Sequence, residues 1–350
     1  MEQFVNLEIN TLPVPTWNQL SMNNTKIALS AYPPELRVIG EEVAASTTFS
    51  LEKIATGMGE SMRQLQMPKK ISICIKENTK VQKTWEILCD KNNEGYFASE
   101  IRAMPQSDTT IFQFISGTKA TEGVCALQTK MKLEEYSHVK LVQIQLLEKP
   151  FRFLNDIGVS CEKNAQFELI QLFLGDADTY TGCYTVLNGK KSQFSADIGY
   201  YAKGNRKIDM NYIADHLSPK TESQIRANGV LDDTSQKIFR GTIDFKNGSS
   251  GSVGAETENI LILGEKAINR TVPLILCAEE DVQGSHGASI GQPDEDVLYY
   301  MGTRGISETE ACCLLARSKI DAVCRRIGDE SIRCRVEKYL TEVMRFGKSN

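Results

Sequence analysis

The sequence predicts a mainly β protein: a right-handed parallel β-helix (a solenoid), flanked by a short N-terminal helical segment and a C-terminal α-helical cap domain. Three observations predict this fold. Short apolar runs recur at a nearly fixed interval from about residue 135 to 280, no helix-sized segment separates them, and helical periodicity follows them only after Pro293. Regular spacing without intervening helices is typical of coils that stack strand on strand.

The spacing of the strands is the strongest of these signals. Val139, Phe167 and Phe194 each open an apolar strand at almost equal intervals, with a further strand halfway between. One strand and its turn therefore take about 14 residues, and breakers such as Asn188-Gly189 and Asn247-Gly248 supply the turns. An antiparallel sandwich with a similar number of strands stays open as the alternative.

The segment before the solenoid, residues 1–66, is expected to be a lead-in with short helices. From Ser50 to Gln66 apolar residues recur at three- and four-residue steps, which predicts one amphipathic helix with Ser50 as its N-cap. After Pro68 the short runs rich in β-branched residues begin. The predicted domains are therefore the lead-in 1–66, the solenoid core 67–290 and a C-terminal helical domain 291–350.

The helical domain carries clear start signals. Asp294-Glu295-Asp296 places acidic residues in a first helical turn, and Ser307 with Glu310 forms a capping box ahead of an apolar stripe. A further amphipathic helix is expected from about Glu330. Because the last strand of a solenoid would otherwise expose unpaired N–H and C=O groups, we expect these helices to cap its open end. Their basic outer faces would then be free to bind a partner.

Composition excludes several classes of function. The chain has 45 acidic and 40 basic residues, so it lacks the basic excess that a nucleic acid partner requires. Its apolar runs are far shorter than the ~20 residues of a membrane span, and nothing at the N-terminus marks it for secretion. We therefore expect a cytoplasmic protein with no membrane partner. It has no glycine-rich loop with the lysine of a triphosphate site and is not expected to hydrolyse ATP itself.

Cysteine and histidine are the candidate metal ligands. The ten cysteines show no two-residue spacing, so we interpret them as reduced thiols, mostly buried, and Cys277 as part of the core. The three histidines, at 138, 216 and 286, form no pair at helical spacing, which argues against a closed zinc site. His216 lies just before a turn and is interpreted as structural. Spacing alone favours the same interpretation of His286.

A resemblance to a known family changes the interpretation of His286. The run Ser285-His286-Gly287-Ala288, followed by Gly291-Gln292 and by Arg304-Gly305-Ile306, resembles the C-terminal signature of the SufB/SufD family of iron–sulfur cluster assembly proteins, on the SufD side. The similarity extends back to Asp215 and covers most of the chain that follows it. It implies a parallel β-helix independently of the strand spacing.

The resemblance also implies a site. The histidine of the Ser-His-Gly-Ala motif would lie at the interface with a SufB-like subunit, where His286 is a candidate iron ligand and nascent cluster chemistry would take place. The SufB cysteine of that interface is replaced by Glu258, so a thiolate ligand is missing here. This departure favours an accessory, SufD-like subunit. No tightly bound cofactor is expected, only a transient iron–sulfur cluster shared at the interface.

The second implied surface would dock a SufC-like ATPase. Tyr299, Tyr300, Arg304 and Gly305 match the portion of the family that contacts this partner, and exposed aromatic residues and arginines are common at interfaces. The expected function is a non-enzymatic scaffold subunit of a SufBCD-type complex. One alternative is a self-pairing homodimeric scaffold. Another is a β-helix enzyme acting on carbohydrate, which would need paired carboxylates, with Glu168 and Asp209 as the scattered candidates.

Overall fold

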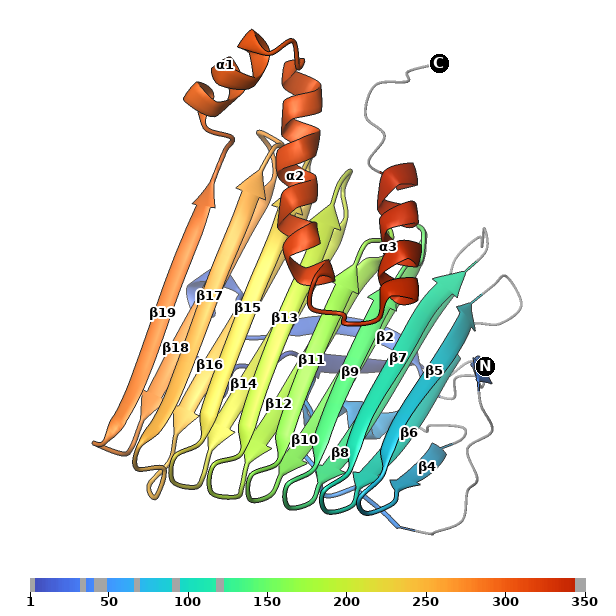
Figure 1. Cartoon of the computed structure of the whole chain (residues 1–350), viewed down its shortest axis with the longest axis vertical. Coiled ribbons are helices and arrows are strands. Elements are labelled where there is room, and N and C mark those ends of the chain that lie inside the picture. Colours follow the sequence, from blue (N-terminus) through green and yellow to red (C-terminus); the bar gives the residue numbers. More distant parts are fainter. Residues whose placement is uncertain are drawn as a thin grey trace.

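The chain forms a flattened parallel β-solenoid of about seven turns (Figure 1). This computed structural model describes residues 4–31, 36–40, 49–65, 70–89, 95–117 and 123–343. Each coil contributes one strand to each of two facing sheets, which we name the even sheet (β4 to β18) and the odd sheet (β3 to β19). The mainly β, parallel β-helix prediction is therefore confirmed, and the antiparallel sandwich is wrong.

The odd sheet has one strand more than the even sheet. In the odd sheet, β3 pairs antiparallel with β5 and every later neighbour is parallel. The even sheet consists of β4 (Lys70–Ile75), β6 (Gly95–Ala103), β8 (Gly123–Leu133), β10 (Phe151–Cys161), β12 (Asp178–Leu187), β14 (Lys207–His216), β16 (Gln236–Phe245) and β18 (Ile268–Cys277). The odd sheet consists of β3 (Arg37–Gly40), β5 (Lys80–Cys89), β7 (Asp108–Gly117), β9 (His138–Gln145), β11 (Gln166–Phe173), β13 (Gln193–Ala202), β15 (Glu222–Leu231), β17 (Ser252–Ile262) and β19 (Val282–Gly291).

The predicted period appears directly in the strand register. Val139 lies opposite Phe167, and Phe167 lies opposite Phe194. The two phenylalanine rings stack with centroids 5.6 Å apart. Because alternate side chains of a strand point to opposite faces, this inward row fills the space between the sheets with one continuous apolar core.

The outward faces of both sheets are also covered. The outward residues of the odd sheet, such as Val142 and Ile144, pack against the C-terminal helices. The outer face of the even sheet carries an antiparallel hairpin of β1 (Phe4–Ile9) and β2 (Thr25–Ser30), with the 3₁₀ turns η1 (Asn18–Leu20) and η2 (Glu60–Gln64). The composition of the N-terminal segment did not predict this hairpin.

The helix predicted from Ser50 to Gln66 is wrong. Among the described residues of this range only Glu60–Gln64 is helical, as a 3₁₀ turn. The backbone around Gly57 instead bonds to the even sheet: its N–H donates to the Ile157 carbonyl (3.0 Å) and its carbonyl accepts from Asn211 Nδ2 (2.9 Å). A β-carbon at Gly57 would overlap the backbone of Cys183, so only glycine allows this approach. Tertiary bonds thus replace the helical ones that the apolar spacing predicts.

The hairpin is fastened through a buried ion pair. Arg240 on β16 and Asp209 on β14 are joined Nη1 to Oδ1 at 2.6 Å, and both side chains are almost completely buried. Asn10 Nδ2 and Thr25 Oγ1 donate to the same carboxylate at 2.7 and 2.5 Å. Arg240 Nε donates to the Met22 carbonyl at 2.7 Å. These residues, which we name the hairpin latch, join the hairpin and the turn before β2 to coils that lie far along the chain.

The three C-terminal helices begin where their sequence signals indicate. They are α1 (Glu295–Thr303), α2 (Glu308–Cys324) and α3 (Glu330–Val343). Asp294 caps α1 through the N–H groups of Asp296 and Val297, and the capping box of Ser307 and Glu310 is complete. In the described part of the chain, no helix is long and apolar enough to cross a bilayer.

The prediction that these helices close the solenoid is wrong. Helix α2 packs on β13, β15 and β17, and α3 lies over the earlier strands of the same face (Figure 1). Ala316, Ile320 and Val323 are buried there because the outward residues of the odd sheet offer a broad apolar surface. The last coil, β18 and β19, is left open. Cys277, predicted in the core, is accordingly exposed at the end of β18.

Candidate functional site: the open terminal coil and the helical corner

The last coil presents two free strand edges. Within the described residues β18 pairs only with β16, and β19 pairs only with β17. Their outer edges carry backbone N–H and C=O groups that are available for pairing. Ile268, Ile275 and Ile290 are about two-fifths exposed on the same coil. The end of the solenoid therefore has both the hydrogen-bonding groups and the apolar side chains of an interface.

His286 lies near the middle of β19 and is exposed. In the register of the sheet it stands opposite Glu256 on β17. Residues in register on parallel strands point to the same side, and Glu256 points inward, since its carboxylate lies against Gly241 on the facing even sheet. His286 therefore belongs to the inward row and stands at the mouth of the solenoid interior.

Glu258 is buried behind this mouth and does not lie on the exposed edge. Lys237 Nζ on β16 contacts its Oε1 at 2.5 Å, and Thr271 Oγ1 donates to its Oε2 at 2.6 Å. Both members of the ion pair are fully buried. Burial lowers the pKa of Lys237, while Glu258 acts to raise it. Glu258 and Lys237 therefore form a buried ion pair beneath the last coil.

Glu256 is the residue of this site that the sequence did not reveal. Burial, and then the charge of Glu258, raise its pKa to about 8, while Lys237 acts to lower it. Its carboxylate lies against Gly241 on the opposite sheet, where any β-carbon would overlap it. The signal was available in β17, because Glu256, Glu258 and Ile260 share one phase of the alternation. Lys237, on β16, is a second residue of this site that was not predicted from the sequence.

The residues matched to ATPase docking gather at the end of α1. Tyr299 and Tyr300 are 76% and 59% exposed. The guanidinium of Arg304 lies over the Tyr300 ring at 5.3 Å, and Gly305 ends the turn with φ of 81°. Val297 on the same helix is also exposed. These residues form an aromatic corner on the helix that directly follows β19.

His216 is buried and neutral. Its Nδ1 and Nε2 lie 2.7 and 2.8 Å from the hydroxyls of Thr221 and Ser223, and its ring packs on Phe245. Burial lowers its pKa to about 4. This geometry agrees with the structural interpretation of His216.

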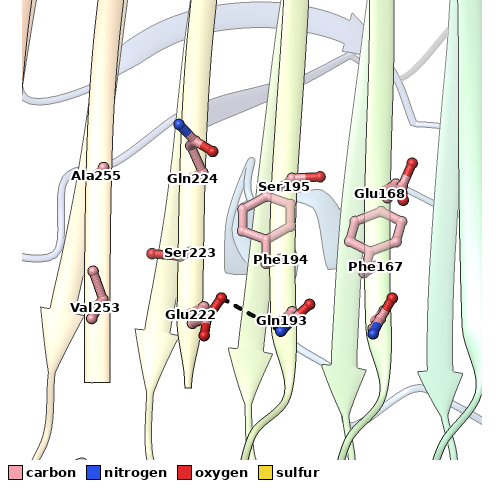
Figure 2. A pocket seen from close by; sticks show the side chains of 11 residues that line it. Phe167, Glu168, Gln193, Phe194, Ser195, Glu222, Ser223, Gln224, Val253 and Ala255 are labelled. Atoms are coloured by element: carbon pink, nitrogen blue, oxygen red, sulfur yellow. Dashed lines mark hydrogen bonds between the residues drawn. The ribbon is translucent and has the colours of Figure 1, made fainter. Parts of the chain in front are cut away.

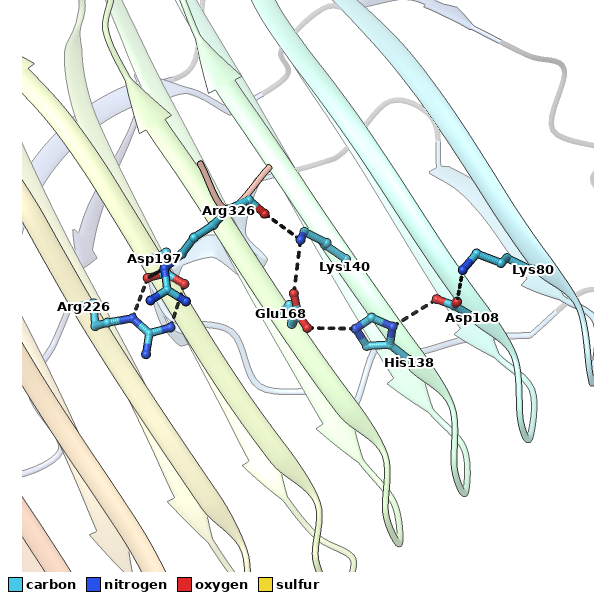
Figure 3. A network of polar contacts seen from close by, with 8 residues as sticks. All are labelled: Lys80, Asp108, His138, Lys140, Glu168, Asp197, Arg226 and Arg326. Carbon is cyan, nitrogen blue, oxygen red and sulfur yellow. Dashed lines mark hydrogen bonds and ion pairs between the residues drawn. The ribbon is translucent and has the colours of Figure 1, made fainter. Parts of the chain in front are cut away.

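His138 forms part of a ladder of charges across the odd sheet (Figure 3). Its Nδ1 lies 3.0 Å from Asp108, and its Nε2 lies 3.2 Å from Glu168. Lys140 contacts Glu168 and donates to the carbonyl of Arg326 (2.7 Å), in the turn between α2 and α3. The hydrogen bond that His138 donates to Glu168 is the largest cause that raises the pKa of His138. The ladder thus helps to hold the helices on the sheet.

Replacing His138 with glutamine is expected to lower the free energy of unfolding by up to about 1 kcal/mol at pH 5.5, since the partners are partly exposed. A folded-state pKa above the unfolded value stabilises the fold below the unfolded pKa, and that stabilisation is lost as pH rises through the folded pKa. The deficit should therefore shrink by pH 9. Urea unfolding at both pH values measures it, with His286→Gln as the matched control. A deficit that grows at pH 9 would contradict the assignment.

A shallow groove of about 500 Å³ lies on the odd sheet beside this ladder. Figure 2 shows polar side chains of β11, β13 and β15 along it, including Glu168 and Glu222. The hydrogen bond from His138 is the largest cause that lowers the pKa of Glu168 to about 2, so this residue is no general acid. The other candidate, Asp209, belongs to the hairpin latch. Both carboxylates suggested for carbohydrate chemistry are thus committed to ion pairs.

No group of three or more His, Cys, Asp or Glu side chains in the described ranges is arranged to hold a metal ion. An intrinsic closed metal centre is therefore not seen in this part of the chain. The features that stand out are the open terminal coil and the aromatic corner. Both features belong to a parallel β-solenoid.

Comparison with known proteins identifies the family. Residues 90–319 match the family model described as SUF system FeS cluster assembly, SufBD core domain. The chain therefore belongs to the SufB/SufD family of iron–sulfur cluster assembly proteins.

The chain is similar to both branches of this family. It is 26% identical to the Bacillus subtilis iron–sulfur cluster assembly protein SufD over 52% of this chain and 41% of the relative. Identity is 26% to SufB of the same organism, over 49% and 37%, and 24% to SufD of Escherichia coli, over 47% and 38%. The matches thus span about two-fifths of the length of these relatives.

Proposed function

We propose that the chain is a non-catalytic, SufD-like scaffold subunit of a cytoplasmic SufBCD-type complex. In this proposal the terminal coil pairs with a SufB-like subunit, the aromatic corner docks a SufC-like ATPase, and a cluster forms transiently where the two solenoids meet. The observation that carries the proposal is the open coil with His286 in its inward row. Family membership supplies the kind of chemistry.

The terminal coil suits the pairing of two solenoids. Parallel strands with free outer edges accept another strand through backbone hydrogen bonds, and the alternate side chains set the specificity. Because β18 and β19 end both sheets at the same place, a second solenoid would continue both sheets at once. The exposed isoleucines of this coil would then be buried.

His286 would serve as a ligand of iron that the complex handles as cargo. A neutral imidazole is a suitable ligand for iron. Glu258 would support this site from the coil beneath it, as part of the buried ion pair with Lys237. Soft ligands would come from the partner, since Glu258 stands where the family interface has a cysteine.

The aromatic corner would link ATP hydrolysis to this interface. Helix α1 follows β19 after a very short connection, so a force applied to Tyr299 and Tyr300 acts close to the strand that carries His286. Helices α2 and α3 are held on the odd sheet by their apolar stripe. Movement of the docked ATPase would therefore displace the terminal coil before the other coils.

Anaerobic co-expression with a SufB-like chain and a SufC-like chain tests the proposal. We expect a three-component complex, loss of the ATPase alone in a Tyr299→Ala/Tyr300→Ala variant, and a complex that is intact but poor in cluster in His286→Ala. Recovery of the chain with neither partner would contradict the proposal. A stable dimer of the chain alone would favour the self-pairing scaffold instead.

A further inference from the structure

We infer that Glu256 and His286 form one half of an Fe²⁺ site at the mouth of the solenoid, completed by the partner chain. The inference rests on the proposed function for its cargo, and it adds a carboxylate ligand that the sequence signature does not contain.

The register places the two side chains together. Glu256 and His286 are direct neighbours on adjacent parallel strands and belong to the same inward row. Adjacent strands lie ~4.8 Å apart. A carboxylate and an imidazole that stand side by side at this spacing are able to share one metal ion.

Glu256 has an unused ligand atom. Its Oε1 is buried and has no hydrogen-bond partner among the described residues. Leaving a buried polar atom unsatisfied is costly, so such atoms in folded proteins call for an explanation. The nearby cation does not supply one, because Lys237 donates to Glu258 and Thr271. A cation that arrives from the open mouth would satisfy this oxygen.

The donor set favours a transition metal. Mg²⁺ and Ca²⁺ prefer oxygen ligands alone, whereas an imidazole with a carboxylate suits Fe²⁺. When the Fe–O bond forms, the carboxyl proton leaves to solvent and the oxidation state of iron does not change. Two ligands from this chain leave the remaining positions open to the partner and to sulfide.

Fe²⁺ titration of the full chain under anaerobic conditions tests the inference. With ¹³C-labelled histidine, the three imidazoles report separately on the metal. We expect selective broadening of His286 in the wild type, and in Glu256→Gln at least about a ten-fold higher Fe²⁺ concentration for half-broadening. Glu222→Gln, a carboxylate on the outer face of β15, is the matched control and should titrate like the wild type. Thermal unfolding shows that each variant is folded.

The outcomes separate the two ideas. Broadening of His286 at wild-type Fe²⁺ concentrations in Glu256→Gln would overturn the role of Glu256 and leave the proposed function standing. Broadening of His138 or His216 in place of His286, or no response up to millimolar Fe²⁺, would also overturn the inference. Failure of the proposed function would appear separately, as absence of the partner chains in the co-purification.

Discussion

Replacing Arg240 with alanine is expected to lower the free energy of unfolding by about 3–5 kcal/mol. The guanidinium is fully buried and bonds to Asp209 and to the Met22 carbonyl. Its removal leaves the Asp209 carboxylate buried without its cation, and the two other donors of the latch cannot neutralise it. Guanidinium chloride unfolding followed by circular dichroism measures the loss.

The control for this prediction is a partly exposed ion pair, whose arginine lies on the same sheet. Arg102→Ala removes a contact to Glu134 in which the arginine is 39% exposed, so it should cost no more than about 1 kcal/mol. Adding Asp209→Asn to Arg240→Ala should restore part of the stability, because the stranded charge is gone. Equal effects of Arg240→Ala and Arg102→Ala would show that the latch is not important for stability.

The second large effect is expected from Lys237→Met. This change removes the only cation that bonds to Glu258 among the described contacts and leaves two carboxylates, Glu256 and Glu258, in the interior. We expect a loss of about 3–5 kcal/mol at pH 8, measured by chemical unfolding. Methionine keeps the length of the side chain, so the loss comes from charge and little from a cavity.

The pH dependence of this variant has a definite sign. A carboxyl whose folded pKa is raised, as that of Glu256 is to about 8, favours the folded state below the unfolded pKa, and this contribution is lost as pH rises through the folded value. The deficit of Lys237→Met should therefore be largest near pH 8 and shrink towards pH 4.5. Adding Glu258→Gln should recover stability. A deficit that is independent of pH, or no gain in the double variant, would refute this account of the buried charges.

The strand period and the helix starts were predictable because both are local signals. The near-constant interval between apolar runs placed Val139, Phe167 and Phe194 in the register that the sheets adopt. A capping box lies within one turn, so Ser307 and Glu310 define the start of α2 without any other part of the chain. The residues of the aromatic corner were named from the family resemblance, and their role in docking stays a prediction.

The failed predictions share a cause, namely that a distant surface decided the outcome. The spacing of Leu51 to Leu65 suggests a helix, but the backbone at Gly57 bonds to strands β10 and β14, which lie much later in the chain. The C-terminal stripe predicts an amphipathic helix correctly, yet it does not say which apolar surface the helix covers. In the structure it covers the outer face of the odd sheet, where residues such as Val142, Ile144 and Leu172 form an apolar surface.

The candidate site likewise combines a residue predicted from the sequence with a neighbour that only the structure reveals. His286 was reached through a motif, whereas its pairing with Glu256 emerged only from the register, since the two residues lie a whole coil apart along the chain. By itself, the sequence determined the kind of fold, its period, the starts of the C-terminal helices and the family, because each depends on patterns that are short or that repeat. Tertiary structure alone decided which coil stays open and which carboxylates face the interior, because those properties depend on how the coils stack.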